Sequence, residues 1–155
     1  MAERPFTSWI AAAALVASGC TAAAGPRLVW QAPDGPATDR PATAVAAGLV
    51  TRAPGVRLGP WGESPEASFL LREATAPEEP HIHRNHDLTV VLLRGRGVLH
   101  LDDGPHPLTA GDVVHVARGR LHWFESLGHD PALGLAIYTP QMVGQDFEPA
   151  SSDKR

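Results

Sequence analysis

His81-Ile82-His83 is the first of two stretches that decide the fold of this chain, and the second is Gly111-Asp-Val-Val-His-Val-Ala-Arg-Gly-Arg-Leu-His122. Side chains two residues apart on a strand point to the same face of a sheet, so the first pair of imidazoles shares one side. A third histidine from a neighbouring strand can meet them, and neutral imidazole is a common ligand of divalent transition metals. The pattern therefore predicts a metal site made by His81, His83 and His122.

The residues around these stretches predict an all-β domain. Short apolar runs are separated by turn residues, as where the run 98–101 stops at Asp102-Asp103-Gly104. Comparable runs occupy residues 68–73, 88–93, 112–116, 121–125 and 132–138. No long helical pattern lies between them, so we expect an antiparallel sandwich or barrel.

Together these stretches resemble the two sequence motifs of the cupin superfamily. The positions that match are His81, His83, Gly95, Gly111, Gly119 and His122. Ala117 and Ser126 stand where the second motif usually has proline and asparagine. The resemblance spans about residues 68–138 and implies a double-stranded β-helix, or jelly-roll, barrel over residues 66–140.

One ligand of the usual cupin set is missing. The first motif normally carries a glutamate that is separated from its glycine by six residues, and Leu88 occupies that position here. Asp87 has the right spacing from His83 but stands one residue too far from Gly95, so Asp87 and His86 are candidates for a fourth ligand. Three alternatives follow: a three-histidine site, a site with a recruited fourth ligand, or a barrel that has lost its metal and binds an organic ligand.

The resemblance implies a divalent transition metal, which could be iron, zinc, copper, nickel or manganese. Three neutral imidazoles would leave such a site with a charge of about +2, which favours an anionic substrate or hydroxide. The implied activity is that of a metal-dependent oxygenase or isomerase of small molecules. The alternative is a non-enzymatic module that binds a small ligand or a metal at the cell envelope. No catalytic residue and no specific small molecule can be assigned from the sequence.

Other partners are constrained by charge and by the family. The net charge of −4 and the absence of a basic run argue against nucleic-acid binding. Cupins commonly pair through their sheets, so a homodimer is one expected assembly.

The first residues resemble a bacterial lipoprotein signal peptide at positions 1–19. The apolar run 9–17 is too short to span a bilayer, and it ends in Ala17-Ser18-Gly19-Cys20, the only cysteine. In such signals the cysteine is lipidated and becomes the new N-terminus. Ala17 and Glu3 depart from the usual pattern, and an ordinary secretory signal is the alternative. We expect export to the cell envelope and a membrane anchor at Cys20.

The composition on either side of the barrel differs from that of the barrel itself. Residues 20–65 are rich in alanine and contain seven prolines, which predicts a disordered tether or an N-terminal arm. Within this segment, residues 45–51 could form a short edge strand and Trp61 could pack on the domain. Residues 141–155 are predicted to form a polar tail over the surface.

Overall fold

The computed structural model describes residues 25–150. The predicted signal peptide and Cys20 lie outside these described residues. Among the residues that are described, no helix has the length and apolar character needed to cross a membrane.

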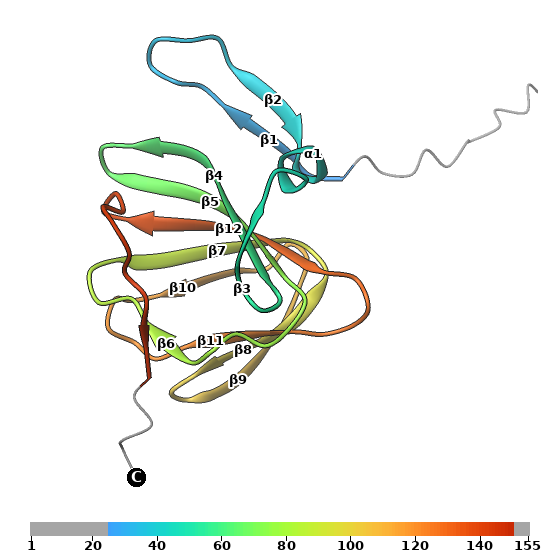
Figure 1. The fold of residues 1–155 in the computed structure, drawn as a ribbon, viewed down its shortest axis with the longest axis vertical. Helices are drawn as coiled ribbons and strands as arrows, with labels where there is room; N and C mark the ends of the chain where they lie inside the picture. The colour runs from blue at the N-terminus through green and yellow to red at the C-terminus, as the bar shows by residue number, and fades with distance from the viewer. Residues whose placement is uncertain (1–24, 151–155) are drawn as a thin grey trace, which may run out of the picture.

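A six-stranded antiparallel sheet forms the larger layer of the molecule (Figure 1). Its strands, in spatial order, are β10 (Val113–Val116), β7 (Asp87–Arg94), β12 (Ala132–Thr139), β5 (Ala67–Ala74), β4 (Val56–Ser64) and β3 (Val50–Ala53). The β-branched and leucine residues of β7 pair with β10 on one side and β12 on the other, which places this strand inside the sheet.

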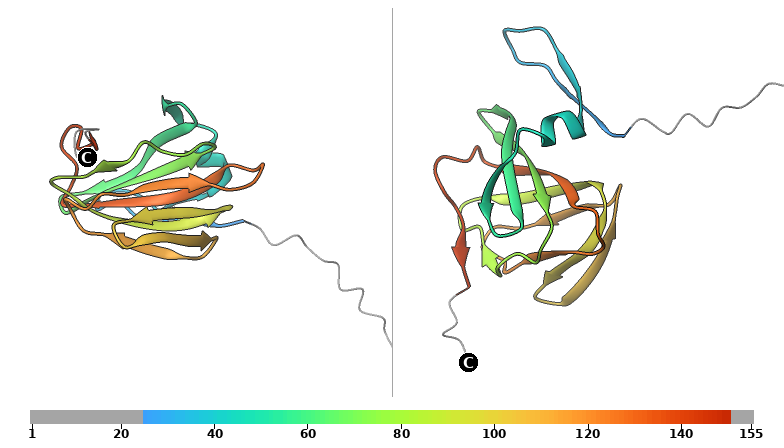
Figure 2. Two further views of the ribbon diagram at one scale, coloured as in Figure 1. Left: turned by 90° about the horizontal axis from the view of Figure 1, so that it is seen from below. Right: turned by 45° about the vertical axis from the view of Figure 1, so that its right-hand side comes forward.

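A smaller sheet of three strands faces the larger one (Figure 2, left). It consists of β11 (Trp123–Ser126), β8 (Arg96–Leu101) and β9 (Gly104–Thr109). Leu99 of this sheet packs between the layers against Leu88, Val116 and Tyr138 of the large sheet. Two packed antiparallel sheets with this connectivity confirm the predicted all-β jelly-roll fold.

The predicted tether corresponds in large part to ordered structure. β1 (Arg27–Trp30) and β2 (Thr38–Pro41) form a hairpin that leads into the short helix α1 (Ala42–Ala46). This segment covers the outer face of the large sheet. Its buried residues Leu28, Ala42, Ala46 and Leu49 pack in one cluster with Leu71 of β5 and Leu133 of β12. Trp30 also contacts the aromatic rings of Trp61 and Phe69.

The boundary of the barrel is therefore earlier than residue 66. Strand β4 pairs along its whole length with β5, and β3 is the edge strand, so residues 50–64 belong to the large sheet. The prolines that suggested a linker occupy positions that strands tolerate: Pro54 lies in the β3–β4 turn and Pro60 at a shift in the β4–β5 register. The expected edge strand over 45–51 starts later, at Val50, and Trp61 packs on the domain as predicted.

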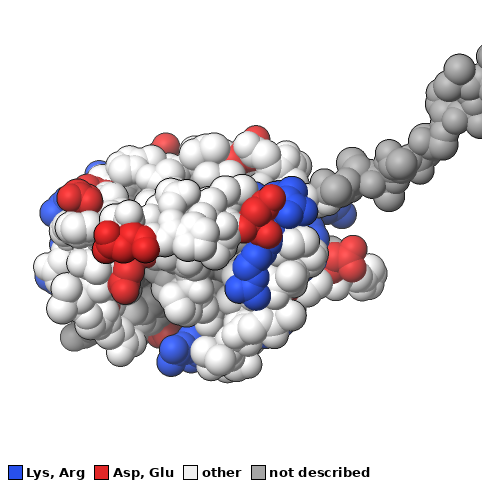
Figure 3. Space-filling view, turned by 90° about the horizontal axis from the view of Figure 1, so that it is seen from above, with Lys and Arg blue, Asp and Glu red and all other residues white. Residues whose placement is uncertain are grey.

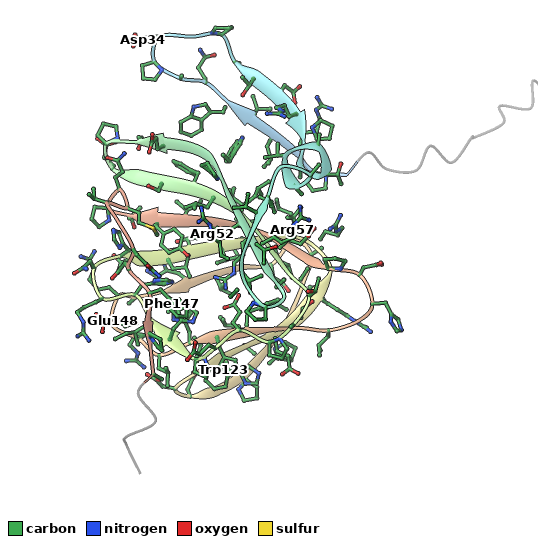
Figure 4. All side chains as sticks on the ribbon, viewed as in Figure 1. Asp34, Arg52, Arg57, Trp123, Phe147 and Glu148 are labelled. Carbon is green, nitrogen blue, oxygen red and sulfur yellow. The ribbon has the colours of Figure 1, made fainter. Side chains whose placement is uncertain are left out.

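The end of the described chain returns to the barrel rather than only crossing its surface. β13 (Glu148–Pro149) pairs with β6 (His81–Ile82), the strand that carries the first histidine of the predicted site. Figure 4 shows Phe147 and Glu148 on this side of the molecule, beside β6. Seen from above, acidic and basic side chains are interspersed on the described part of the surface (Figure 3).

Candidate metal centre

His81, His83 and His122 come together at one end of the barrel. His81 lies in β6, His83 follows that strand, and His122 directly precedes β11. His81 and His122 face each other across an antiparallel bridge, in which His81 N donates to His122 O at 3.0 Å and His122 N donates to His81 O at 2.9 Å. One nitrogen from each of the three rings lies within 4.8 Å of the others. The histidines predicted from the sequence are therefore the ones that the fold groups.

The hydrogen bonds of the three rings leave one nitrogen of each ring available to a metal. His81 Nδ1 lies 2.8 Å from Glu79 O, His122 Nδ1 lies 3.0 Å from Arg120 O, and His83 Nδ1 contacts the carbonyl oxygen of Asp146. Because a carbonyl only accepts, each Nδ1 must carry the proton and each Nε2 must present its lone pair.

All three Nε2 atoms are buried and have no hydrogen-bond partner among the described residues. Buried polar atoms are nearly always paired, because an unpaired one costs about 1–3 kcal/mol. A metal ion would satisfy all three lone pairs at once, and carbonyl-oriented imidazoles are the usual surroundings of metal-bound histidine. The donor set thus fits a transition metal.

Burial also keeps these imidazoles in the form that binds metal. Burial lowers the pKa of His81 to about 3 and that of His122 to about 4. It lowers the pKa of His83 as well, against the raising effect of the hydrogen bond to Asp146. At neutral pH the three rings are therefore uncharged, and protons do not compete with a metal for their lone pairs.

Neither candidate for a fourth ligand joins the group. The carboxylate of Asp87 accepts hydrogen bonds from the backbone N of Arg118 at 2.9 Å and from its Nη2 at 2.8 Å, and these bonds hold the pKa of Asp87 below its usual range. His86 Nδ1 lies 2.5 Å from Asp146 Oδ2. Leu88, at the position of the usual glutamate, is buried in the core between the sheets.

The C-terminal segment supplies two residues that sequence reasoning missed. Asp146 holds the His83 ring through its carbonyl, and its carboxylate accepts from the backbone N of Arg84 and of Asn85, each at 3.0 Å. Phe147 stacks on His81, with 4.4 Å between ring centroids. Nothing in the local sequence of 141–150 signals these roles, since both depend on a contact made across more than sixty residues.

A groove with a volume of about 1000 Å³ leads to the histidines. Its lining includes His83 and Tyr138, the apolar residues Val56, Leu58 and Met142, and an ion pair between Arg72 and Glu78. A smaller cavity of about 60 Å³ lies within the barrel and is lined by His122 together with the same ion pair. The groove therefore reaches the histidine group at His83, and the interior cavity reaches it at His122.

Comparison with known proteins supports the same family. Residues 70–138 match the family described as "Cupin domain". An uncharacterized protein of Aquifex aeolicus is 34% identical over 84 residues, which cover 54% of this chain and 69% of that protein.

Two solved structures share the fold at low identity. A protein with a double-stranded β-helix domain from Klebsiella pneumoniae has a TM-score of 0.58 at 18% identity, over 70% of this chain and 95% of that one. Pac13 of Streptomyces, a nucleoside dehydratase, has a TM-score of 0.53 at 21% identity, over 62% and 78% of the two chains. The family match, the jelly-roll barrel and the two histidine motifs agree: residues 70–138 form a cupin domain.

Proposed function

We propose that this cupin binds one divalent transition metal through Nε2 of His81, His83 and His122 and acts on a small molecule that enters through the groove. The observation that carries the proposal is the convergence of three buried Nε2 atoms, each without a partner in the described structure. Each ring is already oriented by a backbone carbonyl, so little reorganisation is needed to bind an ion.

The proposed activity is that of a metal-dependent oxygenase or isomerase. Three protein ligands leave coordination positions open, and a metal held there would act as a Lewis acid or bind dioxygen beside the substrate. The chain's own residues would shape the site: Phe147 covers one face of His81, and Tyr138 meets the edge of His83 at 5.0 Å between centroids. These aromatic rings restrict the access of water to the three imidazoles.

The test is turnover by protein loaded with one metal at a time. Metal-free protein is reconstituted separately with iron, zinc, copper, nickel or manganese, and dioxygen uptake and product formation are followed with phenols, thiols, diketones and organic acids. The matched control is His115→Ala, because His115 is exposed and its ring lies 3.0 Å from the hydroxyl of Thr89, away from the histidine group. Activity that requires His83 but not His115 supports an enzyme.

A non-enzymatic binding module is the second candidate. It is favoured by Leu88, which replaces the carboxylate ligand of the usual set with an apolar side chain. Stable, stoichiometric metal binding without turnover of any substrate class would select this alternative.

We further propose that the chain is exported and anchored to a membrane by lipidation of Cys20. The support is the run of small residues before the only cysteine. Wild-type protein should then fractionate with membranes and Cys20→Ala should not. Continued membrane association of the variant would contradict the lipid anchor.

A further inference from the structure

A charged pair lies on the inner side of the barrel, where the neighbouring residues are apolar. Side chains alternate along a strand, so Arg72 of β5 faces the interior together with Leu70 and Ala74, and Leu71 faces the outer core. Arg72 Nη2 pairs with Glu78 Oε1 at 2.5 Å, and the side chains are only 20% and 6% exposed. Removing two charges from water is expensive, and their mutual attraction often fails to offset it. Stability alone is therefore a weak reason for this pair.

Arg72 retains hydrogen-bonding capacity that the protein does not use. A guanidinium carries five N–H donors in a planar fork. Its Nε is buried and has no acceptor among the described residues, although Glu78 occupies Nη2. The second oxygen of Glu78 is engaged elsewhere, since Oε2 accepts from the backbone N of Phe124 at 3.3 Å. The Nε–H of Arg72 is therefore free to donate to an acceptor that enters the barrel.

The position of Arg72 connects this fork to the metal centre. Arg72 and Glu78 line the groove with His83 and line the interior cavity with His122. A metal ion and a guanidinium would then present two positive charges to the same space.

We propose that Arg72 binds the carboxylate of an organic-acid substrate, and that Glu78 is the internal counter-ion that the carboxylate competes with. The proposal rests on the proposed function, because it assumes that the substrate reaches the three-histidine centre through the same groove. A carboxylate matches the guanidinium fork with two parallel hydrogen bonds. The apolar walls at Val56, Leu58 and Met142 would take the body of the acid.

The test compares the binding of benzoate and of its neutral analogue benzamide by calorimetry, with full-length protein in metal-loaded and metal-free forms. Wild type should bind benzoate and not benzamide. Glu78→Gln keeps an acceptor for the backbone N of Phe124 but frees Arg72, so it should bind benzoate about five- to tenfold more tightly. Arg72→Met combined with Glu78→Gln removes both charges without leaving either one unpaired, and it should bind benzoate at least tenfold more weakly.

Arg52→Gln is the matched control. Arg52, which is labelled in Figure 4, lines the same groove and is exposed, so its loss should change the affinity less than threefold. Equal benzoate affinity in wild type and in the double variant would overturn the proposal. If the double variant does not fold, Glu78→Gln decides alone: unchanged or weaker binding contradicts the competition.

Metal content separates this inference from the proposed function. A double variant that holds one metal per chain but has lost its preference for benzoate supports both. A wild type that holds metal but binds benzoate no better than benzamide refutes the role of Arg72 and leaves the metal site intact. A wild type that takes up no metal refutes the proposed function, and the metal-free titration then still measures the contribution of Arg72.

Discussion

Replacing Asp146 with alanine should weaken the metal centre and destabilise the fold at the same time. The carboxylate of Asp146 is buried and accepts hydrogen bonds from the backbone N of Arg84 and of Asn85, each at 3.0 Å, and from Asn85 Nδ2 at 3.2 Å. It also contacts His86 Nδ1. These bonds hold Arg84 and Asn85, which follow His83, against the C-terminal segment that contains Asp146.

The magnitude follows from the groups that would lose their acceptor. Two backbone N–H groups would be left unpaired, and a hydrogen bond to a charged group contributes about 1.5–3 kcal/mol. Water can partly enter the space left by the Asp146 carboxylate and replace these hydrogen bonds, which reduces the cost of losing them. We therefore expect the free energy of unfolding to fall by about 3 kcal/mol. The Asp146 carbonyl orients the His83 ring, and loss of the carboxylate contacts should displace this carbonyl. Metal affinity should therefore also weaken by about 10- to 100-fold.

The assay is urea denaturation of metal-free protein, together with a metal titration against a competing chelator. Asp146→Asn keeps one acceptor oxygen, so its free energy of unfolding and its metal affinity should fall less than those of Asp146→Ala. Glu148→Gln is the surface control, because the Arg84–Glu148 ion pair is exposed and should contribute less than about 1 kcal/mol. An Asp146→Ala variant with wild-type stability and metal affinity within a factor of two would refute the reasoning.

Three further predictions concern pH, packing and the rejected ligand. In the folded protein the pKa of His81 is lowered to about 3 and that of His122 to about 4. Histidine in the unfolded chain has a pKa near 6.5, so the unfolded state takes up protons first as the pH falls. The stability of metal-free protein should therefore fall as the pH drops from about 6.5 towards 4, by about 1.4 kcal/mol per pH unit for each such imidazole, and a flat profile from pH 7 to 4.5 would contradict the burial of these rings. Gly97→Ala places a Cβ 2.4 Å from a backbone oxygen and should cost about 1–3 kcal/mol by thermal denaturation, whereas Gly35→Ala meets nothing within 4 Å and should change stability little. Asp87→Asn should leave the metal content unchanged, because the Asp87 carboxylate is hydrogen-bonded to Arg118. Loss of the metal in this variant would show that Asp87 is a ligand.

The barrel and its three histidines were predictable because both depend on local pattern. Short apolar runs with glycine turns predict antiparallel strands, and the i, i+2 spacing of His81 and His83 places both on one side of a strand. The motif around Gly111 and His122 then fixes which third histidine is available. The structure groups these three rings as expected.

The N-terminal segment could not be predicted from composition. Its prolines and alanines are typical of a linker, but composition does not reveal that β4 finds a partner in β5 or that Leu28 reaches a hydrophobic patch on the outer face of the sheet. Pro60 is tolerated only because the strand pairing shifts at that point. Partner choice, rather than local propensity, decides the structure here.

The parts of the site that sequence reasoning missed depend on long-range contacts. Asp146 and Phe147 lie in a segment predicted to be a polar tail, and they reach the histidines only because β13 pairs with β6. Arg72 and Glu78 are ordinary surface residue types, and their position inside the barrel follows from strand parity and the path of the loop after β5. A single sequence carries no signal for either arrangement.

The most direct test of the account is the metal content of untagged protein, measured by elemental mass spectrometry for wild type and for His83→Ala. The account predicts about one equivalent of a single transition metal per wild-type chain and essentially none in the variant, with His115→Ala retaining the wild-type content. A wild-type protein that stays folded but cannot be loaded with any of the five metals, or a His83→Ala variant that keeps full metal content, would contradict the three-histidine centre.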